Sequence, residues 1–74
     1  MSLLTQAYLL EQYGPRLSVD QLAKVLDRKS TTIYNQVSAG SFEIPTYLDG
    51  ARRFSDYRDV AAYLDACRAR AAVQ

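Results

Sequence analysis

The sequence of 74 residues contains no histidine and only one cysteine, Cys67. The absence of histidine removes the commonest general base and the commonest zinc ligand, and one thiolate is too few for a metal site within one chain. A single cysteine also excludes an intramolecular disulfide, so the framework of small secreted domains is absent. The three glycines, Gly14, Gly40 and Gly50, stand far apart and form no phosphate-binding loop. We therefore expect no enzyme, no cofactor and no metal.

Long apolar runs are also missing, so no segment has the length needed to cross a bilayer. The first residues lack the basic region and apolar stretch of a signal peptide, which predicts a cytoplasmic protein. Apolar residues nevertheless make up 49% of the chain and charged residues 23%, a balance that supports a folded core rather than a disordered tail. We expect one small domain over residues 1–74.

Apolar residues at helical spacing and local end signals predict four helices. The expected segments are residues 3–13, 19–26, 31–39 and a last helix that follows Ser55. Gly14 and Pro15 end the first helix, because proline cannot continue it. Ser18 and Gln21 form the pattern of a capping box for the second helix, while Ser30 and Ser55 are expected to cap the third and the last.

Two of these helices are expected to bury a particular apolar face. In the first helix the predicted face consists of Leu3, Ala7 and Leu10, with Leu4 and Tyr8 on its flank. In the last helix it consists of Tyr57, Val60, Ala61, Leu64, Cys67 and Ala71.

A β-hairpin is predicted between the third and the last helix. Asp49 and Gly50 separate two β-prone runs, and both residues tolerate positive φ. The ribbon is too short to be stable alone, so it must pack on the helices. The predicted fold is mainly α with a small β-hairpin: a helix, a helix-turn-helix, a two-stranded wing and a C-terminal helix.

The second and third helices carry the pattern of a helix-turn-helix. Ala23 is small, as needed where the two helices cross, and Ile33 and Val37 would anchor the third helix to the core. Its opposite face presents hydroxyl and amide side chains that suit the major groove of DNA. These candidate DNA-binding residues are Ser30, Thr31, Thr32, Asn35 and Gln36. The simpler interpretation is a capped surface helix with no DNA contact.

Basic residues stand at two other places where a winged helix-turn-helix contacts DNA. Arg52 and Arg53 follow the turn of the hairpin, where arginine is favoured by the negative potential of the minor groove. Arg28 and Lys29 lie in the turn before the third helix. The alternative for the hairpin arginines is a solvated surface.

Five segments together resemble small winged-helix proteins related to the MerR group. The similar segments are residues 17–23 (LSVDQLA), 30–34 (STTIY), 40–45 (GSF followed by Pro45), 50–54 (GARRF) and 59–64 (DVAAYL). They span roughly residues 17 to 66, and their order and spacing are more specific than any one of them. The most similar members are excisionases of phages and mobile elements, also called recombination directionality factors, and AlpA-like prophage regulators.

The resemblance implies a nucleoid-associated protein that binds double-stranded DNA beside an integrase site, bends it and self-associates there in several copies. An integrase is the implied protein partner, and some members regulate transcription of phage genes. The sequence departs from the family pattern in the turn, where Asp27 and Arg28 replace a glycine and an aliphatic residue. Asp27 tolerates the left-handed conformation, and Arg28 is expected to face DNA or solvent. Gln36 stands where an aromatic residue is common.

The net charge of +1 favours a second interpretation. Neutralisation of phosphates supplies most non-specific DNA affinity, and a strong DNA binder is normally more basic. The chain could instead be a protein-interaction module, an anti-repressor or an assembly factor that keeps this fold without tight DNA binding. Its terminal helices would then contact the partner.

Overall fold

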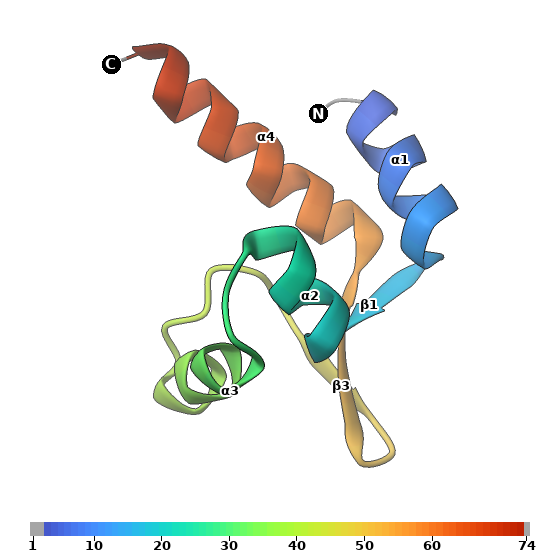
Figure 1. The fold of residues 1–74 in the computed structure, drawn as a ribbon, viewed down its shortest axis with the longest axis vertical. Coiled ribbons are helices and arrows are strands. Elements are labelled where there is room, and N and C mark those ends of the chain that lie inside the picture. Colours follow the sequence, from blue (N-terminus) through green and yellow to red (C-terminus); the bar gives the residue numbers. More distant parts are fainter. Residues whose placement is uncertain (1–2, 74) are drawn as a thin grey trace.

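The computed structural model describes residues 3–73 and contains four helices and three strands over that range (Figure 1). The elements in chain order are α1 (Leu3–Tyr13), β1 (Arg16–Ser18), α2 (Val19–Leu26), α3 (Ser30–Ala39), β2 (Tyr47–Asp49), β3 (Arg52–Asp56) and α4 (Tyr57–Val73). The mainly helical content and the β2–β3 hairpin are as predicted from the sequence. None of the helices in residues 3–73 has the length and apolar character required to traverse a membrane.

The sheet has three strands in the described chain rather than the predicted two. Its order is β1-β3-β2, and both pairings are antiparallel. Leu17 of β1 stands opposite Ser55, and Leu48 of β2 stands opposite Arg53. The central strand β3 therefore joins the hairpin to the segment that leads into α2, which fixes the hairpin relative to the helices.

The core lies where all four helices and the sheet meet. α1 and α4 lie side by side at one end of the molecule, and α3 and the tip of the hairpin lie at the other (Figure 1). The buried side chains of the core are Leu9, Leu17, Val19, Leu22, Ile33, Ile44, Val60 and Ala61. Together they connect every helix to the strand β1 and to the loop before β2.

The prediction of which face of α1 is buried is wrong. Leu9 is the buried side chain of this helix, whereas Leu3 is 79% and Leu4 84% exposed. The predicted face of α4 is confirmed only for its first half, because Val60 and Ala61 are buried and Ala71 is exposed.

Of the three predicted serine caps, the structure confirms one. Ser18 forms the capping box of α2 with Gln21. Ser30 instead lies inside α3 and donates its hydroxyl to Asp20 at 2.9 Å. Ser55 is buried within β3 and donates to the Pro45 carbonyl at 2.9 Å.

Tight turns are formed where the sequence predicted them. Asp27 ends α2 in the left-handed region, with φ of 54°. Gly50 in the β2–β3 turn has φ of 65°, which a glycine adopts without steric cost.

Candidate nucleic-acid interface

The position of α3 is set by its packing on α2. Ile33 is fully buried and Val37 partly buried, as predicted for the anchors of this helix. Because residues three and four apart share one face of a helix, this anchoring turns Thr31, Thr32 and Asn35 outward, where all three are exposed. α3 therefore presents hydroxyl and amide groups to solvent.

The nine predicted site residues fall into two classes of exposure. Five are exposed: Lys29, Thr31, Thr32, Asn35 and Arg52. Four are partly buried and make hydrogen bonds within the chain: Arg28, Ser30, Gln36 and Arg53. The five exposed residues are therefore the most accessible of the nine to a large ligand.

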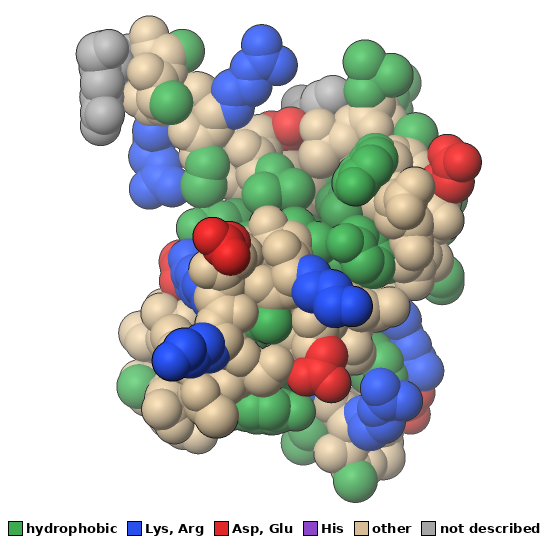
Figure 2. Space-filling view, viewed as in Figure 1, with side chains coloured by type: hydrophobic (Ala, Val, Ile, Leu, Met, Phe, Trp, Pro, Cys, Tyr) green, Lys and Arg blue, Asp and Glu red, His purple; other side chains and the backbone are tan. Residues whose placement is uncertain are grey.

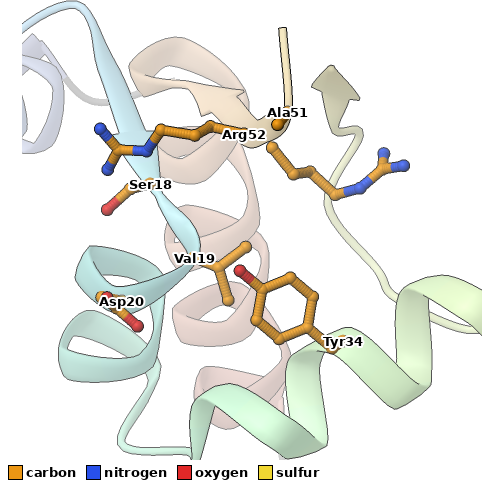
Figure 3. Close-up of a pocket in the computed structure, with 7 residues that line it drawn as sticks. Ser18, Val19, Asp20, Tyr34, Ala51 and Arg52 are labelled. Carbon is orange, nitrogen blue, oxygen red and sulfur yellow. The ribbon is translucent and has the colours of Figure 1, made fainter. Parts of the chain in front are cut away.

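A groove separates α3 from the β2–β3 hairpin (Figure 3). Its lining residues are Ser18, Val19, Asp20, Tyr34, Ala51, Arg52 and Arg53. The groove thus brings together both hairpin arginines, the beginning of α2 and one side chain of α3. Thr31 and Thr32 do not line it and lie outside it on α3.

The two hairpin arginines point to opposite faces of the sheet, as neighbouring residues in a strand do. The guanidinium carbon of Arg52 lies 5.4 Å from the ring centroid of Phe54. Arg53 donates from Nη1 to Oγ1 of Thr46 at 2.7 Å. Arg52 is therefore the more exposed of the two and the better placed for an external contact.

Phe54 is also covered by a second arginine. The guanidinium carbon of Arg16 lies 3.8 Å from the centroid of its ring, and the same guanidinium forms an ion pair with Asp49 at 2.5 Å. Because Arg16 is on β1 and Asp49 on β2, this pair bridges the outer strands across β3. The hairpin carrying Arg52 is thereby tied to the rest of the sheet.

Arg28 and Gln36 belong to an internal network on the other side of α3. Nη1 of Arg28 donates to Oε1 of Gln36 at 3.0 Å, and both terminal nitrogens donate to the carboxylate of Glu43, at 3.2 and 2.7 Å. The hydrogen bonds from Arg28 lower the pKa of Glu43 to about 2. The carboxylate is therefore fully ionised at neutral pH.

Tyr34 is the main residue of this surface that the sequence analysis did not select. Its side chain lies on α3 and lines the groove, and the residue is 51% exposed (Figure 3). Tyrosine is usually part of a core or its rim, so its residue type gave no indication. Its position next to buried Ile33 and three residues after exposed Thr31 could have placed it on the outer face.

The charge of this region is mixed. Figure 2 shows Lys and Arg side chains separated by acidic, polar and apolar ones, rather than one continuous basic surface. Within residues 3–73, no three acidic, cysteine or histidine side chains gather in a way that could hold a metal ion. The groups available for recognition are thus hydroxyls, amides, a phenol and a few cations.

Comparison of the chain with protein-family models, with curated proteins and with solved structures gives no match.

Proposed function

We propose that the chain is a winged helix-turn-helix protein that binds double-stranded DNA, with α3 in the major groove and the β2–β3 hairpin as the wing. The observation that carries the proposal is that α3 exposes its hydroxyl and amide side chains to solvent, while the exposed Arg52 of the hairpin lines the groove beside this helix. Hydroxyl and amide side chains contact base edges and phosphates, and arginine suits the minor groove beside them.

The resemblance to excisionases and AlpA-like regulators extends this proposal to a role. The protein would bind as several copies at an attachment site beside an integrase and bend it for excision, or occupy a promoter. A net charge of +1 supports binding by several copies, because one copy neutralises few phosphates.

A mobility-shift titration of the DNA that flanks the protein's own gene tests the proposal. The wild type should produce stepwise shifts of one fragment at moderate salt. Thr32→Ala should weaken binding by about tenfold, which corresponds to the loss of one base or phosphate contact. Arg52→Glu should weaken it further, because it also places a negative charge beside the DNA.

Arg68→Glu is the matched control for Arg52→Glu. Arg68 is exposed on α4 and undergoes the same change of charge far from the groove. The affinity of Arg68→Glu for the DNA fragment should remain close to that of the wild type. Full affinity in both Thr32→Ala and Arg52→Glu, with circular dichroism showing folded protein, would refute the proposal.

A second candidate is a protein-interaction module, and the exposed apolar surface of α1 favours it. Figure 2 shows apolar side chains gathered over this helix, and its exposed members are Leu3, Leu4, Tyr8 and Leu10. Exposed apolar side chains in a cluster are typical of protein contacts. Folded wild-type protein that shifts no fragment in the titration would favour this candidate, and α1 would be the surface to substitute.

A further inference from the structure

Arg28 connects four separate segments of the chain. It lies in the turn between α2 and α3 and bonds to Gln36 on α3, to Glu43 in the loop that leads to β2, and to Tyr63 on α4. The contact with Tyr63 is from Nη2 to the phenol oxygen at 3.2 Å. The two hydrogen bonds to Glu43 use both terminal nitrogens and both carboxylate oxygens, which fixes the guanidinium in orientation as well as in position.

Apart from these hydrogen bonds, α3 has few contacts with the other described elements. Among the described elements, α3 packs extensively against α2 alone. Ile33 anchors its first half, whereas the second half is held by the partly buried Val37 and by the hydrogen bond from Arg28 to Gln36. The network therefore ties the second half of α3 to α4 and to the loop that precedes the hairpin.

Little of the Arg28 guanidinium remains for an external ligand. Its terminal nitrogens make four hydrogen bonds inside the chain, and its side chain is 25% exposed. Release of these bonds for a phosphate contact would leave Glu43 ionised and facing the same phosphate. Arg28 is thus poorly suited to contact DNA directly.

We infer that Arg28 and Glu43 are positioning residues, which hold α3 and the hairpin in the relative orientation needed to bind DNA. The inference rests on the proposed function. It changes the role expected for Arg28 and Gln36 from DNA contacts to supports of the helix that makes those contacts.

Removal of the Glu43 charge distinguishes this role from direct contact, because the two roles predict effects of opposite sign. If Arg28 contacted DNA, Glu43→Gln would remove a competing carboxylate and a repulsive charge, and binding would become tighter. If the pair positions α3, the same substitution weakens binding even though it makes the protein more positive.

The experiment measures affinity for the fragment shifted by the wild type, by fluorescence anisotropy at fixed salt. Glu43→Gln should weaken binding about fivefold. Glu11→Gln is the matched control, because Glu11 is exposed on α1 and loses the same charge, and it should not weaken binding. Arg28→Lys keeps the positive charge but loses the planar fork, so it should weaken binding as Glu43→Gln does.

Hydrogen exchange of the free protein provides a readout without DNA. Amides of residues 36–40 should exchange faster in Glu43→Gln and in Arg28→Lys than in the wild type. Unchanged exchange would overturn the inference. Wild-type protein that binds the fragment, with Glu43→Gln binding equally or more tightly, overturns this inference alone. Wild-type protein that binds no DNA overturns the proposed function and the inference together.

Discussion

At the scale of single residues, the ion pair of Arg28 and Glu43 couples stability to pH. The pKa of Glu43 falls from its ordinary value of 4.5 to about 2 in the folded chain because Arg28 donates two hydrogen bonds to the carboxylate. A carboxylate with a lowered pKa stabilises the fold at pH values above 4.5, and this stabilisation disappears as the pH falls toward 2. The pair is partly exposed, so solvent screening reduces its contribution.

Chemical denaturation of the wild type and Glu43→Gln at several pH values measures this contribution. At pH 7 the free energy of unfolding of Glu43→Gln should be about 1 kcal/mol lower than that of the wild type. This difference should shrink between about pH 5 and pH 2. Glu11→Gln removes the same charge from an exposed position on α1 and is the control for the loss of a carboxylate. A difference that stays constant over this pH range would contradict the assignment of the effect to this ion pair.

The serines show how far the role of one residue can be predicted from its neighbours in sequence. The role of Ser18 was predictable because its partner Gln21 is three residues away. Ser30 and Ser55 instead bond to Asp20 and Pro45, both of which are ten residues distant in sequence. Local capping rules contain no information on such tertiary partners. The network of Arg28 was unpredictable for the same reason.

At the scale of elements, Asp27 determines where α2 ends and how the chain turns into α3. Its φ of 54° places it in the left-handed region, and its amide donates to the carbonyl of Ala23. Aspartate adopts this conformation more easily than most residues with a side chain, and glycine adopts it more easily still.

Substitution of Asp27 tests this turn. Asp27→Ala should lower the free energy of unfolding by about 1 kcal/mol, because alanine is disfavoured in the left-handed region. Asp27→Gly should preserve stability or raise it slightly. Thermal denaturation followed by circular dichroism measures both. Equal stability of the alanine and glycine variants would show that the turn is not strained at this position.

At the same scale, α2 has the bounds that were predicted from the sequence. α1 also has the predicted bounds, but its buried face is not the predicted one. Apolar residues surround α1, so periodicity did not specify one side, and contact with α4 decides it. Part of that contact is polar, because Thr5 donates to Asp65 at 3.1 Å. β1 was missed because three residues are too short to show alternation, and their pairing with β3 is a long-range contact.

At the scale of the whole molecule, ion pairing reduces the positive charge available at any one surface. Arg16, Arg28 and Arg58 each form an ion pair with a carboxylate. Lys29 and Arg52 are exposed at the candidate interface. Lys29 precedes α3 in the chain, and Arg52 follows it. DNA recognition by this molecule would therefore depend on where a few groups are held rather than on a large positive field.

The most direct test of the proposed DNA surface is a set of 1H–15N correlation spectra of the whole chain, recorded as duplex DNA is added. If this surface binds DNA, the largest shift changes fall in residues 29–36 and 50–54, which cover the turn, the exposed face of α3 and the tip of the hairpin. Amides of α1 and of the second half of α4 should change little. Changes concentrated on α1 and α4, or no changes at any DNA concentration, would contradict DNA binding through α3 and the hairpin.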